Sequence, residues 1–191
     1  MVATQRSSAA EGILMQRKRP PVASVLTFLL CGVAAFGQST PLPGNKKPRT
    51  PADYQPRTLK KIISEETQVG ASRADEDGMI LHGNILPSRV RATYAGSSRP
   101  LTQSGRRVLT KWAQRFAGDP THYTGPYETE MLFSENGTKH WLAVRKNVAS
   151  QLGQEIKKGE AVELFLIRLG RMKTGGRWEL LLLVESFQKA S

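Results

Sequence analysis

The sequence predicts an α+β fold in which a small antiparallel β-barrel carries one amphipathic helix. Three observations predict it. Short runs with the periodicity of strands occupy Gly78–Ser191, one helical pattern interrupts them, and an Asn-Gly turn at 136–137 separates two of the runs. The length of this segment fits a single globular domain, and no internal repeat is visible.

The first predicted strands are Met79–Ile85 and Arg89–Tyr94, which lie on either side of Pro87. In the second of them, apolar and polar residues alternate, which is the period of a half-buried strand. The helix follows at Thr102–Ala117. Its apolar residues recur at helical spacing and predict a buried face, made of Leu101, Val108, Leu109, Trp112 and Phe116.

The second half of the domain reads as strand, strand, short helix, strand, strand. Tyr127–Phe133 and His140–Arg145 form a predicted hairpin, and Asn147–Ile156 is a predicted short helix. Ala161–Leu169 and Trp178–Phe187 are the last strands. Their continuous apolar runs are typical of strands that are covered on both faces.

This order, with the turn sequence Lys-Lys-Gly-Glu-Ala-Val at 157–162, resembles the OB-fold, a small Greek-key barrel. A Lys-x-Gly-(Asp/Glu)-x-Val turn recurs there before a barrel strand, and Val90–Tyr94 would supply a further strand. The chain also resembles uncharacterised exported bacterial proteins with a helix and a terminal barrel. The resemblance implies the barrel but no activity, because such barrels host many unrelated functions.

Residues 1–37 are predicted to form a secretory signal peptide. Arg17–Arg19 are basic, Val22–Phe36 is apolar, and small residues stand before a cleavage point after Gly37. The apolar run is shorter than the roughly 20 residues of a spanning helix, so no transmembrane span is expected after cleavage. Met15, directly before the basic cluster, is the preferred start. The protein is therefore expected to be exported, to the periplasm or beyond it.

Residues 38–77 are predicted to be a disordered linker. The segment is rich in Pro, Lys and Arg, a composition that buries too little apolar surface to offset its ordering entropy. Cys31, the single cysteine, lies in the predicted signal peptide. The mature domain, Gly78–Ser191, is thus expected to have neither disulfides nor thiolate metal sites.

No constellation of residues predicts catalysis, a metal or a cofactor. His82, His122 and His140 do not stand at the spacing of metal ligands. Glu128 and Glu130 share a strand face by the two-residue period, and we interpret them as solvated carboxylates rather than an acid–base pair. The protein is accordingly expected not to be an enzyme.

Net charge is the one positive functional signal. The chain has 28 Lys and Arg against 16 Asp and Glu, a formal charge of +12, and most of the excess follows Gly78. Such clusters suit anionic envelope polymers or lipid head groups, with nucleic acid a less expected partner for an exported protein. A merely solvated surface is the alternative. The candidate ligand-binding residues are Arg107, Lys111 and Arg115 on the helix, and Arg168, Arg171, Lys173 and Arg177 around the last loop.

The three tryptophans are assigned to the core, with a ligand platform as the alternative for Trp141 and Trp178. Together these observations predict an exported, non-enzymatic binding module of the cell envelope. The alternative is a structural or assembly accessory protein whose exposed strand edges join a larger complex; a protein partner is then expected.

Overall fold

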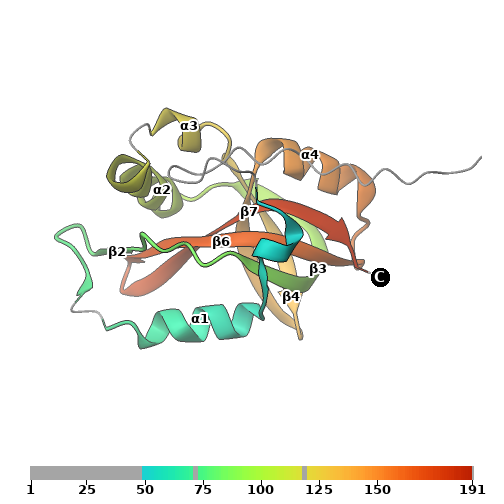
Figure 1. The fold of residues 1–191 in the computed structure, drawn as a ribbon, viewed down its shortest axis with the longest axis horizontal. Coiled ribbons are helices and arrows are strands. Elements are labelled where there is room, and N and C mark those ends of the chain that lie inside the picture. Colours follow the sequence, from blue (N-terminus) through green and yellow to red (C-terminus); the bar gives the residue numbers. More distant parts are fainter. Residues whose placement is uncertain (1–48, 71–72, 118–119, 191) are drawn as a thin grey trace, which may run out of the picture. The chain divides into compact units, whose positions relative to one another are not determined.

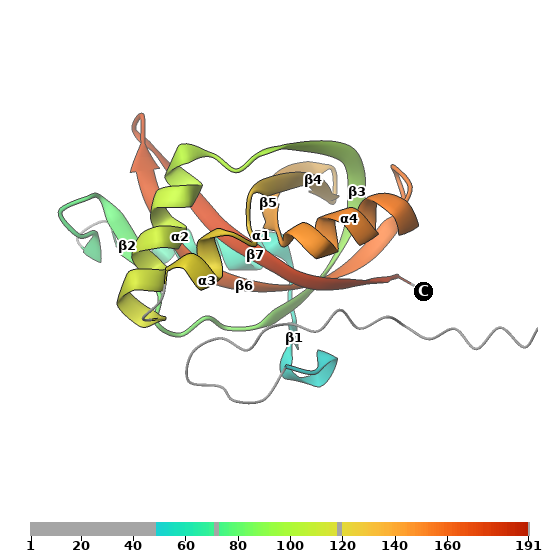
Figure 2. The same cartoon turned by 90° about the horizontal axis from the view of Figure 1, so that it is seen from above.

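The structure, a computed structural model, describes residues 49–70, 73–117 and 120–190. Its centre is a closed five-stranded barrel in the order β3-β4-β5-β7-β6, which the pairing of β3 with β6 closes (Figures 1 and 2). The pairs are antiparallel except for β5 with β7. The strands are β3 (Ser88–Pro100), β4 (Thr129–Glu135), β5 (Thr138–Val144), β6 (Ala161–Thr174) and β7 (Arg177–Lys189).

The predicted α+β fold with an OB-like barrel is therefore confirmed. Helix α4 (Lys146–Glu155) connects β5 to β6 and corresponds to the short predicted helix. Helix α2 (Gln103–Phe116) corresponds to the long predicted helix. Two strands extend the barrel into a mixed sheet. β1 (Gln55–Pro56) runs parallel to β3, and β2 (Met79–Leu81) pairs antiparallel with β6.

Two apolar clusters build the core. Alternate residues of all five barrel strands, such as Val90, Phe133 and Leu164, fill the interior together with side chains from α1 and α4. The second cluster joins the outer faces of β5, β6 and β7 to α2 and to the short helix α3 (Thr121–Thr124). Trp112 is central to it and is 2% exposed, as predicted, whereas Phe116 is 36% exposed at the end of α2.

The predicted linker is too long, because part of it belongs to the folded domain. Residues 49–70 contain the 3₁₀ turn η1 (Pro51–Asp53), β1 and helix α1 (Leu59–Gln68). Leu59 and Ile62 of α1 are buried in the barrel core. The Tyr54 hydroxyl donates to Glu185 of β7 at 2.7 Å.

Contacts with residues that are distant in the sequence explain why this segment is folded. The carboxylate of Glu135, at the end of β4, accepts the backbone N–H groups of Leu59 and Lys60 at 2.8 and 2.9 Å. It thereby satisfies two of the free donors at the start of α1. The predicted signal peptide and residues 38–48 lie outside the described residues. Among the described helices, none has the length and apolar character needed to span a membrane.

The hairpin turn between β4 and β5 is as predicted, with Asn136 at φ +50° and Gly137 at φ +81°. We expect Gly137→Val to lower the free energy of unfolding by about 1–3 kcal/mol, because a β-branched residue is strained at positive φ. Urea unfolding measures this. Gly153→Ala in α4 is the control; since open space surrounds that position, it should stabilise the protein by about 0.5–1 kcal/mol. Equal stability of wild type and Gly137→Val would contradict the assigned turn.

Candidate functional site: a basic surface and a carboxylate-lined pocket

Two cations of α2 reach the turn before β2, and the backbone of β6 lies beside the same turn. Arg107 Nη2 and Lys111 Nζ lie 3.5 and 3.1 Å from the Asp77 carboxylate oxygens. The backbone N–H of Lys173 donates to the carbonyl of Gly78 at 3.1 Å, which places β6 beside the same turn. We give the name basic surface to five exposed cations of α2 and the β6–β7 hairpin, namely Arg107, Lys111, Arg115, Lys173 and Arg177.

Arg168 and Arg171 do not belong to this surface, which corrects the sequence-based assignment. Their side chains are 11% and 4% exposed. Both turn toward Glu66 of α1, a residue that the sequence places in the linker. Because α1 packs against this part of β6, the two guanidinium groups are covered and cannot reach an external polyanion.

A buried ion cluster results. Glu66 is 2% exposed, and its Oε1 atom lies 2.7 Å from Arg168 Nη1 and 2.8 Å from His82 Nε2. Arg171 Nε lies 3.8 Å from Glu66 Oε2, and the same guanidinium donates to the carbonyl of Val69. Arg171 also covers the ring of Trp178 at 4.3 Å. The cluster ties α1 to β6 and therefore has a structural role.

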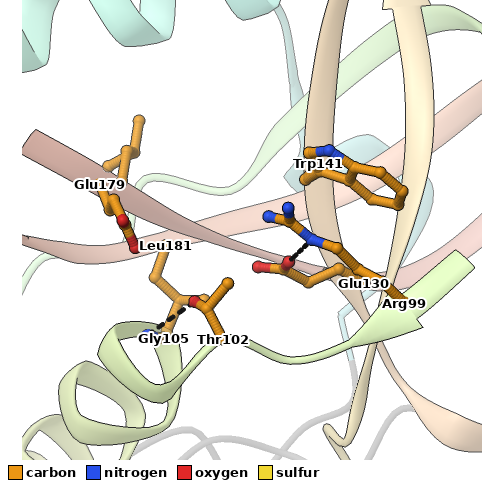
Figure 3. A pocket seen from close by; sticks show the side chains of 8 residues that line it. Arg99, Thr102, Gly105, Glu130, Trp141, Glu179 and Leu181 are labelled. Atoms are coloured by element: carbon orange, nitrogen blue, oxygen red, sulfur yellow. Dashed lines mark hydrogen bonds and ion pairs between the residues drawn. The ribbon is translucent and has the colours of Figure 1, made fainter.

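A pocket of about 240 Å³ opens on the outer face of the barrel, beside the start of α2 (Figure 3). Arg99 and Glu130 are opposite one another on β3 and β4, and Arg99 Nε donates to Glu130 Oε2 at 2.6 Å. The guanidinium lies 4.3 Å from the ring centre of Trp141 on β5. The lining residues are Arg99, Thr102, Gly105, Glu130, Trp141, Glu179, Leu180 and Leu181.

Glu130 departs from the sequence interpretation. It is 6% exposed rather than solvated, while Glu128 is exposed and precedes β4. Burial raises the pKa of Glu130, and the Glu179 carboxylate adds to the rise while Arg99 opposes it. The cause is the register of β3 on β4, which sets Arg99 opposite Glu130 and lets a paired carboxylate be buried.

A second pocket, of about 510 Å³, lies between α1 and the β4–β5 hairpin. Its lining includes Lys60, Ile63, Glu135 and His140. Burial lowers the pKa of His140, against the opposing effect of Glu135. The Glu135 carboxylate already accepts hydrogen bonds from two backbone N–H groups at the start of α1. It is therefore less available to an external ligand in this pocket.

Among the described side chains, no group of three or more His, Cys, Asp or Glu is placed to hold a metal ion. His82 is bound to Glu66 and His140 lies in the second pocket, whereas the side chain of His122 is outside the description. Comparison of the sequence with models of known protein families and with characterised proteins gives no match. Function is therefore inferred from the charges and geometry of the basic surface and the pocket.

Proposed function

We propose that this protein is an exported, non-enzymatic binding module of the cell envelope, and that its basic surface binds a polyanion. An anionic envelope polymer or a layer of anionic lipid head groups has the required chemistry. The observation that supports the proposal is the pair of exposed α2 cations, Arg107 and Lys111, at the Asp77 carboxylate, with the backbone of Lys173 in β6 beside the same turn.

Asp77 makes this surface adaptable. Its side chain is 39% exposed, and those of Arg107 and Lys111 are 49% and 50% exposed. Ion pairs this exposed contribute little to stability, so a ligand phosphate or carboxylate can replace Asp77 without unfolding cost. A polyanion that contacts several of the five cations releases its condensed counterions, which makes its affinity fall steeply with salt.

The triple variant Arg107→Glu, Lys111→Glu, Arg115→Glu should lose binding to phosphatidylglycerol vesicles while its thermal stability stays nearly unchanged. Wild type should bind strongly at about 50 mM salt and lose orders of magnitude in affinity by about 200 mM. Cosedimentation at the two salt concentrations measures both effects. Failure of wild type to bind these vesicles and dextran sulfate at low salt would overturn the proposal.

Two further variants make the test specific. Reversal of exposed lysines elsewhere changes the total charge equally but should preserve most of the binding; Lys139, Lys146 and Lys157 serve for this. Asp77→Asn should strengthen binding, because it removes the carboxylate that competes with the ligand for Arg107 and Lys111. Equal losses in the two triple variants would mean that net charge alone, and not this surface, governs binding.

The second candidate function is that of an assembly accessory protein. Within the described residues, β2 pairs with β6 on one side only and is an edge strand, which could accept a strand of a partner. A complex of that kind depends on backbone hydrogen bonds and apolar contacts, so it should persist at about 200 mM salt. Binding to an envelope protein that is insensitive to salt would favour this candidate.

A further inference from the structure

We propose that the pocket of Figure 3 is a binding site for a small organic cation, namely a primary amine or guanidine on a short hydrocarbon stem. The inference does not depend on the basic surface. It concerns another face of α2 and a ligand of the opposite charge.

The first argument is the charge balance inside the pocket. Glu130 and Glu179 carry two carboxylates, whereas Arg99 is the one cation among the lining residues. Arg99 is already engaged by Glu130 at 2.6 Å. Among the described residues, Glu179 makes no ion pair. The pocket therefore has one uncompensated negative charge, on a chain whose formal charge is +12.

The second argument is that the free carboxylate is held in place. Ser104, which is 7% exposed in the first turn of α2, donates its hydroxyl hydrogen to Glu179 Oε2. The Ser104 hydroxyl also lies 3.1 Å from that of Thr102, the residue that caps α2. A carboxylate that is oriented before binding costs less ordering entropy when a ligand ammonium reaches it.

The third argument is the chemistry of the walls. In Figure 3 the Arg99 guanidinium lies against Trp141 while Glu179 faces the same space from the opposite wall. This indole therefore already stacks with a cation, a contact that aromatic faces favour. Leu180 and Leu181 add apolar surface for a hydrocarbon stem. A volume of about 240 Å³ is below the roughly 300–1,000 Å³ of sites for drug-sized ligands, so the ligand is small.

An anion does not fit this arrangement, because both carboxylates would repel it and the charge of Arg99 is already compensated. A neutral ligand would leave the Glu179 carboxylate without a positively charged partner. Neutral and anionic probes therefore serve as comparison ligands in the test.

The experiment is an NMR titration of the full chain with n-butylammonium chloride at constant chloride concentration, following the indole N–H of Trp141 and the backbone N–H of Gly105. Saturable shifts of both signals are expected with the amine. n-Butanol, methyl glucoside and butyrate should shift them weakly or not at all. Tighter binding of any of these three probes, or no saturable shift with the amine, would overturn the proposal.

Glu179→Gln keeps the size of the side chain and removes the charge, and it should weaken n-butylammonium binding about tenfold or more. Glu155→Gln, at the exposed end of α4, removes the same charge outside the pocket and should leave binding unchanged. Equal affinity of wild type and Glu179→Gln would also overturn the proposal. Since Glu179 is exposed at the rim, thermal unfolding of both variants should match wild type.

Discussion

Replacement of Trp112 by alanine is expected to lower the free energy of unfolding by about 3–5 kcal/mol. The indole is 2% exposed between α2 and the barrel, and its ring packs edge-on against Tyr123 at 5.6 Å. Its Nε1–H donates to the carbonyl of His82 at 2.8 Å. The variant thus loses apolar burial and a hydrogen bond, and leaves a cavity that the rigid barrel face cannot fill.

Urea unfolding followed by circular dichroism measures the loss without relying on tryptophan fluorescence. Phe116→Ala is the matched control, because this aromatic residue lies one turn further along the same helix and is 36% exposed. It should cost clearly less than Trp112→Ala. A cost below about 1 kcal/mol for Trp112→Ala would show that α2 does not pack on the barrel through this residue.

Glu66→Ala is expected to destabilise the protein by a similar amount, about 3–5 kcal/mol. Glu66 is the only acidic partner that the described ion pairs give to Arg168 and Arg171; Glu66 and Arg171 are buried, and the Arg168 side chain is 11% exposed. Removing the carboxylate leaves two guanidinium charges without compensation in a poorly solvated place. α1 should then detach from β6, because the cluster is its charged contact with that strand.

Chemical unfolding and hydrogen exchange of the α1 amides together test this prediction. Glu65→Ala is the comparison variant: Glu65 is the preceding residue, its side chain is 36% exposed, and it pairs with Arg57, whose side chain is 10% exposed. Because the Glu65 carboxylate is partly solvated and its loss leaves only one guanidinium without a partner, this variant should cost clearly less than Glu66→Ala. Similar costs for the two variants would contradict the structural role of the cluster.

A compensated variant separates charge from packing. Glu66→Met combined with Arg168→Leu and Arg171→Leu removes all three charges and keeps apolar volume, which is often neutral or stabilising for buried ion clusters. It should recover most of the stability that Glu66→Ala loses. No recovery would indicate that the cluster is needed for its directional contacts, among them the bond from Arg171 to the carbonyl of Val69.

The sequence by itself determined the elements whose signals are local. Asn136-Gly137 predicted the hairpin because these residues adopt positive φ, and the spacing of Val108, Leu109 and Trp112 predicted the buried face of α2. The order of strands around α4 was sufficient to indicate the barrel. The turn and the helix face each use residues within a few positions of one another, where local backbone geometry relates sequence to structure; the barrel was inferred from the order of such local elements.

Only the tertiary structure decided which residues are buried and paired when their contacts are distant in the sequence. The sequence did not predict α1, because it lies in a segment rich in Pro and Lys and has few apolar residues. The helix is stable only when Glu135 caps it and the barrel buries Leu59. Arg168 was indistinguishable from a surface cation until α1 brought Glu66 to it. Likewise, Glu130 is buried because strand register sets Arg99 opposite it. Whether a charged side chain is buried depends on which oppositely charged group packs against it, and that group can lie far away in the sequence.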